Sequence, residues 1–323
     1  MDSIIFNMLN SLRCPNCFER LQINFDQKKL NCKTCGSSYE KTSNFLEIIS
    51  EKDIGHIERK SLEIWGKDLH KESHKNKVGH IDKINKKFME FPRILSGDVL
   101  EVGCGTGADA EYISSLSSVN NIIALDIGEN CKDIAKKNLN NKKLKFVRAN
   151  CLNIPFQNKQ FQFVYSYGVI HHTSNPLKAL IEINRILKPK GKVYLYLYSS
   201  HTKNFPKRLG TILETFLMKF LSLLNKKLKI ALIYLISIFC WLSFSIPSLI
   251  LKLLGQRKLA EKFPLHWGLT PLRIIPDLKD RLLAPINHRF STKKIKKLLL
   301  ESNFIEIDII EDSSGIYLIA QKK

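Results

Sequence analysis

A strand that runs into a glycine turn limits the possible folds of this sequence more than any other feature. Residues 99–107 read Val-Leu-Glu-Val-Gly-Cys-Gly-Thr-Gly, and residues 108–116 then have the apolar spacing of a helix. Glycines let the backbone approach a ligand, and the first turn of a helix has free amides. A second apolar strand, residues 121–126, ends on Asp126, whose carboxylate suits the two hydroxyls of a ribose. The pattern predicts an α/β domain that binds a nucleoside-containing cofactor.

The glycine turn alone leaves the identity of that cofactor open. Gly103, Gly105 and Ala108 also satisfy the relaxed form of the dinucleotide-binding fingerprint. An oxidoreductase that uses a dinucleotide is therefore an alternative at this point.

Further motifs resemble the class I S-adenosylmethionine-dependent methyltransferases, in the type 11 branch that includes quinone-biosynthesis enzymes. The resemblance covers residues 97–198 densely and 288–323 more loosely. It implies a Rossmann-like sheet of seven strands, S-adenosyl-L-methionine as cofactor, and methyl transfer as the reaction. The stretches that carry it are 99–107, 144–156, 161–176 and 179–196.

The resemblance also implies which residues hold the cofactor. The glycines make room for its methionine part, which Glu101 helps to position, while Asp126 takes the ribose. Asn150 stands where the family commonly has Asp, but its side-chain carbonyl can accept the same hydrogen bond. A plain turn residue is the alternative for Asn150. The full set is Glu101, Gly103, Cys104, Gly105, Gly107, Asp126, Ile127, Asn150, Cys151 and Tyr167.

Two histidines follow the fourth strand of the pattern. By resemblance, His171 and His172 face the methyl group of the cofactor, where a histidine acts as a base or orients the acceptor. A base is needed only for a protonated hydroxyl or a carbon acid. The alternative is that the pair caps and packs its loop.

Four cysteines near the N-terminus form two C-x2-C pairs, Cys14 with Cys17 and Cys32 with Cys35. Four thiolates at this spacing predict a closed tetrahedral site for structural Zn²⁺ in a small ribbon, with a hairpin over residues 21–30. A redox pair is the alternative, although it does not need a second copy. The remaining cysteines are scattered and the first twelve residues do not resemble a signal peptide, so we expect a cytoplasmic protein.

The rest of the chain divides by composition. The ribbon takes residues 1–50, a helical linker 51–96 and the cofactor-binding core 97–198; residues 199–290 form an insertion, and residues 291–323 return to the core as a helix and two edge strands. Linker positions such as Leu62, Trp65 and Ile84 have helical spacing.

The insertion is both apolar and basic. An amphipathic helix is expected over residues 209–224, and residues 230–251 contain no charged side chain. Residues 199–297 hold 19 basic and 4 acidic side chains, so they supply +15 of the net charge of +21. The run is long enough to span a bilayer, but one crossing would separate the last helix and strands from their sheet. A membrane-associated lid, interfacial or broken near Pro247, is expected, with a soluble lid, a dimer interface or an even number of crossings as alternatives.

These features favour a methyltransferase for a hydrophobic or lipid-linked small molecule, placed peripherally on the anionic inner face of a membrane. The alternatives are an rRNA or tRNA methyltransferase that uses the zinc ribbon to recognise its substrate, and a cofactor-binding protein without catalysis. Nucleic acid is the less favoured partner because the ribbon, with a net charge of +1, is nearly neutral. The acceptor atom and the oligomeric state stay open.

Overall fold

The computed structural model describes residues 11–22, 29–50, 54–55, 59–60, 62, 80–85, 87–88, 91–202, 205–265, 268–312 and 314–323. Residues 23–28 of the expected hairpin and most of the linker, including Trp65, lie outside these residues. The expected helix around Ile84 is present as α4, Ile81–Asn85, and a second helix, α5 (Phe91–Ile94), follows it.

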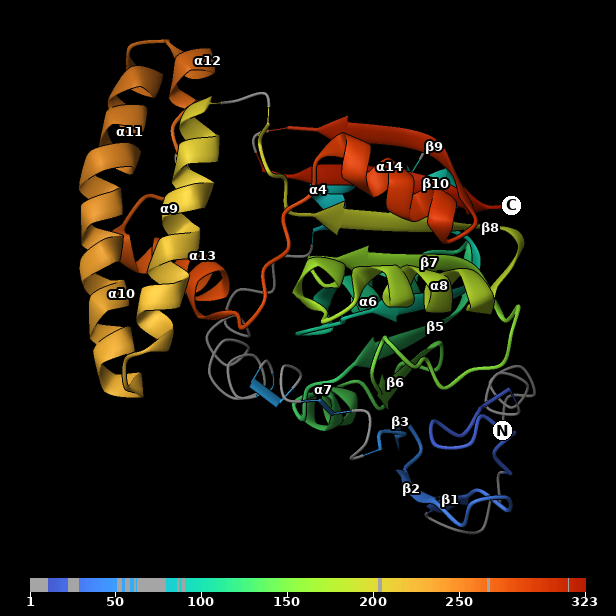
Figure 1. The fold of residues 1–323 in the computed structure, drawn as a ribbon. Coiled ribbons are helices and arrows are strands. Elements are labelled where there is room, and N and C mark those ends of the chain that lie inside the picture. Colours follow the sequence, from blue (N-terminus) through green and yellow to red (C-terminus); the bar gives the residue numbers. More distant parts are fainter. Residues whose placement is uncertain are drawn as a thin grey trace.

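The centre of the molecule is a twisted sheet with helices on both faces (Figure 1). Its order along the sheet is β1-β2-β3-β6-β5-β4-β7-β8-β10-β9. The five strands from β6 to β8 run parallel, whereas β10 is antiparallel to β8 and β9 is antiparallel to β10. The parallel strands are β4 (Gly97–Val102), β5 (Val119–Asp126), β6 (Leu144–Arg148), β7 (Phe161–Tyr167) and β8 (Leu187–Leu197), and the closing hairpin is β9 (Phe304–Glu311) with β10 (Ile316–Lys322).

The predicted α/β fold class is confirmed. In the described part of the chain the sheet has ten strands, because three strands of the ribbon join the seven of the expected sheet. The strands of the ribbon are β1 (Lys29–Asn31), β2 (Ser38–Lys41) and β3 (Phe45–Glu47). β3 pairs in parallel with β6, in the register Phe45 opposite Phe146, so the ribbon extends the central sheet. The reason is burial, because Phe45 and Leu46 are only 2% and 3% exposed and cover apolar surface at that edge.

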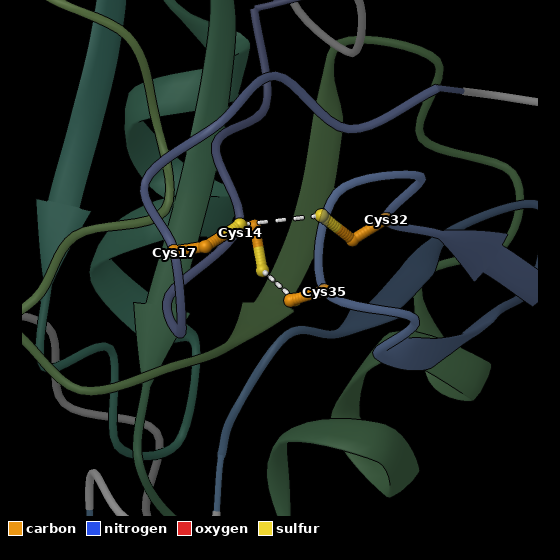
Figure 2. Close-up of side chains that lie close together, drawn as sticks. All are labelled: Cys14, Cys17, Cys32 and Cys35. Carbon is orange, nitrogen blue, oxygen red and sulfur yellow. Dashed lines mark hydrogen bonds between the residues drawn. The ribbon is translucent and has the colours of Figure 1, made fainter.

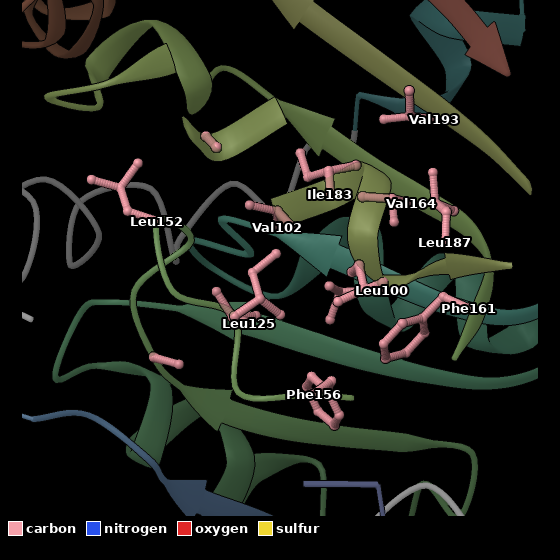
Figure 3. Close-up of a cluster of buried hydrophobic side chains, with 14 of the residues drawn as sticks. Leu100, Val102, Leu125, Leu152, Phe156, Phe161, Val164, Ile183, Leu187 and Val193 are labelled. Carbon is pink, nitrogen blue, oxygen red and sulfur yellow. The ribbon is translucent and has the colours of Figure 1, made fainter. Parts of the chain in front are cut away.

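Successive residues of the parallel strands fill two separate cores, as expected when both faces of a sheet are covered. Leu100 and Leu125 point to one face, in the same buried cluster as Ile183 of α8 (Pro176–Ile186) (Figure 3). That cluster also includes Leu299 of α14 (Thr292–Glu301). Val99, Ile122 and Phe163 point to the other face, towards α6 (Ala108–Ser115) and α7 (Cys131–Lys137).

The insertion after β8 folds as a separate helical layer beside the sheet (Figure 1). Its own small core includes Leu221, Ile233, Ile274 and Leu278. The helices are α9 (Phe205–Ser222), α10 (Lys226–Cys240), the π-helical turn η4 (Trp241–Ser245), α11 (Ile246–Leu253), α12 (Arg257–Ala260) and α13 (Pro271–Leu283).

The expected break near Pro247 does not occur, because α10, η4 and α11 form one continuous helix. The wider turn η4 lies directly before the proline, and the amide of Ile246 donates to the carbonyl of Trp241 five residues earlier. Such a turn absorbs the missing amide and the ring of a proline without ending the helix. By length and composition alone, the stretch Lys227–Leu253 of this helix could cross a membrane. Among the described residues, one helix meets these two criteria.

Candidate functional site

The glycine turn holds Asp126 at the carboxyl end of β5. The amide of Gly105 donates to one carboxylate oxygen at 2.8 Å, and the amide of Gly128 donates to the other at 2.8 Å. Gly103 has a φ of 80° and donates its own amide to the carbonyl of Leu125 at 2.7 Å. These bonds hold the carboxylate of Asp126 between the glycine turn and the loop that follows β5.

A central cavity of about 1840 Å³ opens at this end of the sheet. Its wall includes nearly all the residues that the sequence placed at the cofactor, from Glu101 in β4 to Tyr167 in β7. Its far wall is made of insertion residues, among them Leu217 and Phe244. A typical pocket for one small ligand holds roughly 300–1000 Å³. The central cavity is therefore large enough for a cofactor together with a second molecule.

Gly107 and His171 lie outside the lining of the central cavity. At Gly107 a Cβ atom would come within 2.8 Å of the Ile134 side chain, so this glycine allows α6 and α7 to pack closely. His171 is fully buried, and its ring stacks on Tyr198 with centroids 4.0 Å apart. Burial lowers the pKa of His171 well below its usual value, which keeps the ring neutral. Of the two histidines, His172 is the one that reaches the cavity.

Glu101 shows that the site fits an amine-bearing cofactor. Its carboxylate is 3% exposed, and one of its oxygens has no hydrogen-bond partner within the described structure. Burial, with Asp109 and Asp126 nearby, raises its pKa well above the ordinary value. A ligand ammonium group at this position would supply the missing partner and return the carboxyl to its ionised form. The α-amine of S-adenosylmethionine is such a group.

Two further details concern the cofactor end of the cavity. Asn150 uses its side-chain oxygen to accept from the amide of Leu152 at 2.9 Å, and a carbonyl oxygen has a second lone pair for a ligand. His80, which the sequence interpretation missed, lies beside Asp109 at 2.9 Å and stacks on Tyr167 at 3.9 Å. An aromatic pair at the cavity wall gives a flat apolar contact for a ligand.

A polar cluster lies where the sheet meets the insertion, and the sequence interpretation missed most of it. Tyr198 follows β8 and donates its hydroxyl hydrogen bond to Asp280 of α13. His172 places Nε2 at 3.7 Å from the other oxygen of Asp280. Close by, Arg281 pairs with Asp277 at 2.7 Å. The sequence does contain a signal for this cluster, because acidic residues are rare in the strongly basic stretch 199–297. Three of its four acidic residues line the central cavity here: Glu214, Asp277 and Asp280.

The four predicted metal-binding cysteines lie together at the sheet edge (Figure 2). All four sulfur atoms are within 4.8 Å of one another, with Cys17 and Cys32 separated by 3.3 Å and Cys14 and Cys35 by 3.6 Å. Hydrogen bonds from Ser37 lower the pKa of Cys35 to about 6. Four thiols at these separations fit one tetrahedral Zn²⁺ and leave no open coordination position for catalysis.

The metal is expected to hold the ribbon against the sheet. Leu12, Leu21 and Leu30 of the ribbon belong to the main core, so loss of the metal disturbs that core as well.

Purified protein should contain about one zinc per chain. Cys32→Ser should lose the zinc and lower the unfolding free energy by about 3 kcal/mol or more, as measured by metal analysis and denaturant unfolding. Cys240→Ser, outside the cluster, is the matched control and should keep the metal. Equal metal content in both variants would contradict the assignment.

Comparison with known proteins identifies the core. Residues 100–195 match the family model described as "Methyltransferase domain". The chain is 28% identical over 192 residues to a mitochondrial methyltransferase, OMS1, of Saccharomyces cerevisiae, covering 53% of this chain and 36% of the relative. It is 36% identical over 100 residues to the demethylmenaquinone methyltransferase of Lactococcus lactis subsp. lactis, covering 29% and 39%. It is 31% identical over 109 residues to a probable tRNA methyltransferase 9B of Mus musculus, covering 33% and 23%.

The match is confined to the core of the chain. The chain spans between 23% and 39% of the length of these three relatives, and the two whose names mention a substrate mention different kinds. The family model covers β4 to β8, which are the strands that carry the glycine turn, Asp126 and His172. The core of this chain, residues 100–195, therefore belongs to the S-adenosylmethionine-dependent methyltransferases.

Proposed function

We propose that the protein transfers a methyl group from S-adenosylmethionine to a hydrophobic or lipid-linked small molecule. The observation that carries this proposal is the composition of the central cavity. One end is formed by the glycine turn and Asp126, and the other by apolar side chains of the insertion such as Leu217, Phe244 and Leu278. An acceptor that bridges the two ends would place its apolar body among the insertion helices.

The cofactor would be held by residues already described. Asp126 would accept hydrogen bonds from the ribose hydroxyls, and Glu101 would pair with the amine. The cofactor supplies an activated methyl group, so the protein has to position the acceptor and exclude water. The apolar wall of the insertion is suited to both tasks.

The outer surface of the insertion supports a location on an anionic membrane. Exposed apolar side chains follow α9 at helical spacing, including Leu209, Phe216 and Phe220. The continuous α10–α11 helix has a similar row that ends at Leu253, and only 17% of its most apolar window is buried. Basic residues border these rows, and their positive charge is complementary to that of anionic headgroups. They are Arg208, Lys219, Lys227, Lys252, Arg257 and Lys258.

The packing of the insertion favours contact with one membrane face over spanning. α13 packs against both α9 and α10 through Ile274, Ile275 and Leu278. The same helix brings Asp280 to the central cavity. A helix that left for the bilayer interior would lose this core, so we propose that the rows lie in the headgroup region of one leaflet.

The function is tested with radiolabelled cofactor. Wild-type protein is given S-adenosylmethionine labelled in the methyl group, together with a total lipid extract or total RNA as acceptor. We expect label in the lipid fraction, and label in RNA alone would overturn the proposed acceptor. Asp126→Ala should weaken binding of S-adenosylhomocysteine about 10- to 100-fold in calorimetry, because hydrogen bonds to a charged group are lost. Asp133→Ala, an exposed acid on α7, is the matched control and should bind as wild type.

A further inference from the structure

The segment that follows β6 forms part of the wall of the central cavity. The described residues 149–157, which we call the cofactor loop, lie between β6 and β7 and belong to no helix or strand. Residues 149–152 line the cavity, and the amide of Ala149 donates to the carbonyl of Asp126 at 2.9 Å. The polar backbone groups of the cofactor loop need partners outside the sheet, and those partners decide how firmly it is held.

The ribbon, which lies beside this edge of the sheet, supplies several of these partners (Figure 1). Residues 11–13 pair with residues 155–157 as a short antiparallel bridge. The amide of Arg13 donates to a loop carbonyl at 3.1 Å, and the carbonyl of Ser11 accepts from a loop amide at 2.7 Å. Leu12, the middle residue, is fully buried. The outer half of the cofactor loop is therefore paired with the chain directly before the first cysteine.

Asn153 connects the cofactor loop to the first cysteine turn. Its side-chain amide donates to the carbonyl of Pro15 at 2.9 Å, and Pro15 directly follows the predicted metal ligand Cys14. The side-chain oxygen of Asn153 accepts from Arg13 at 3.2 Å. The backbone amide of Asn153 donates to the carbonyl of Asn150 at 3.0 Å, which closes the turn at the cavity wall. The position of Asn150 therefore depends on the ribbon.

Arg13 joins the ribbon, the cofactor loop and α8. Its Nη2 lies 3.2 Å from Oδ1 of Asn153, 3.4 Å from the carbonyl oxygen of Ile154 and 3.1 Å from Glu182. Its side chain is 13% exposed, so removing the guanidinium would leave shielded oxygens without their donor. Arg185 of α8 also donates to the carbonyl of Ile154, at 2.8 Å. The outer half of the loop would therefore keep one anchor without Arg13.

β3 gives the ribbon a second connection to the cavity. Glu47 of β3 pairs with Arg148 at the end of β6. Nε of Arg148 donates to the carbonyl of Ile127 at 3.2 Å, and Ile127 lines the cavity directly after Asp126. The ribbon is thus joined to both loops that lie beside Asp126, the carboxylate suited to the ribose.

We propose that Arg13 and Asn153 are positioning residues for the cofactor, and that the cofactor and a metal at the four cysteines bind cooperatively. With the metal in place, the backbone of residues 14–17 is fixed and holds Asn153, and through it the cofactor loop, in the form that lines the cavity. Coupling between two binding sites is reciprocal, so the cofactor strengthens metal binding by the same factor. Because α8 also holds the loop, we expect a factor of about 10. The coupling concerns the cofactor alone and does not depend on the acceptor.

Calorimetry with S-adenosylhomocysteine tests the coupling in both directions. Protein with its metal should bind this ligand about 10-fold more tightly than protein from which a chelator has removed the metal. Saturation with S-adenosylhomocysteine should raise the affinity for Zn²⁺ by the same factor, measured by competition with a chromophoric chelator. Purified protein without metal would overturn the proposal. Equal ligand affinity with and without metal, in protein that circular dichroism shows to be folded, would overturn it as well.

Arg13→Gln separates positioning from metal loss because it leaves all four cysteines in place. The variant should keep its zinc and bind S-adenosylhomocysteine about 10-fold more weakly than wild type. Asn153→Ala should have a similar effect, and the double variant should be little weaker than either, since both residues act on one connection. Lys29→Gln, at an exposed basic residue of β1, is the matched control and should behave as wild type. Wild-type affinity in Arg13→Gln would overturn the proposal even if metal-free protein unfolds.

The end of the cofactor that is affected gives a readout that general loss of structure does not. 5′-Methylthioadenosine has the adenosine of the cofactor but lacks its amino-acid part. Because the cofactor loop adjoins Asp126, Arg13→Gln should weaken binding of 5′-methylthioadenosine and of S-adenosylhomocysteine by the same factor. Glu101→Gln should weaken S-adenosylhomocysteine alone, since Glu101 is the proposed partner of the amine. An Arg13→Gln variant that binds 5′-methylthioadenosine as wild type does would contradict the positioning role.

Discussion

Replacing Gly103 by alanine is expected to lower the unfolding free energy by about 3 kcal/mol or more and to abolish cofactor binding. At Gly103 an added Cβ would lie 2.0 Å from Cγ2 of Val169 and 2.9 Å from its Cγ1. Valine is stiff about its first side-chain torsion, and its Cβ would itself be only 3.0 Å away, so a rotamer change does not relieve the clash. The φ of 80° adds backbone strain.

Gly255 offers the matched control because its φ is 79° and no heavy atom lies within 4 Å of the added Cβ. Gly255→Ala should therefore cost only the backbone strain, about 1–2 kcal/mol. Denaturant unfolding gives both values, and calorimetry with S-adenosylhomocysteine gives the binding. The double variant Gly103→Ala/Val169→Ala should recover part of the lost stability, since it removes both methyl groups that clash. Similar losses in the two single variants would show that contact with Val169 is not the cause.

The central part of the fold was predictable because its signals are local. An apolar strand, a glycine turn and an acid at the end of the next strand occur within thirty residues and need no distant contact to be recognised. The pairing of β3 with β6 was not predictable in this way. It joins Phe45 to Phe146, about a hundred residues apart, and a strand of three residues has too little alternation to be detected.

The same distinction applies to the site. Asp126 and Glu101 lie in the motif, so their positions followed from the resemblance, and the structure places both at the cavity. Asp280 and Tyr198 meet only because the insertion folds back onto the end of the sheet. The spacing within residues 209–224 likewise predicts the helix α9, but its apolar side chains differ in what covers them, since Leu221 is buried and Phe216 is 66% exposed. Sequence periodicity gives the direction of a side chain but not what covers it.

Removing three exposed apolar side chains from the insertion is expected to weaken binding to anionic vesicles at least about a hundredfold. The variant is Phe216→Gln/Leu235→Gln/Leu253→Gln, at positions that are 66%, 62% and 80% exposed in α9, α10 and α11. Each such side chain contributes roughly 1.5–3 kcal/mol when it is fully buried in an apolar environment. Even partial insertion of three therefore accounts for the predicted loss, and fold stability should change little because none of them is buried in the protein.

The matched control makes the same kind of change outside the insertion. Leu139→Gln/Leu300→Gln/Ile307→Gln replaces three side chains that are 59%, 59% and 50% exposed on the sheet domain. Sedimentation with vesicles of phosphatidylcholine, with and without phosphatidylglycerol, should give wild-type binding for this control and a loss for the insertion variant. Binding should need the anionic lipid and weaken with salt, because the bordering lysines and arginines each contribute about 1 kcal/mol at a charged surface and are screened by ions. If wild type does not sediment, or if both triple variants lose binding equally, the rows on α9 and α10–α11 do not contact the membrane, and a second protein chain becomes the better candidate to cover them.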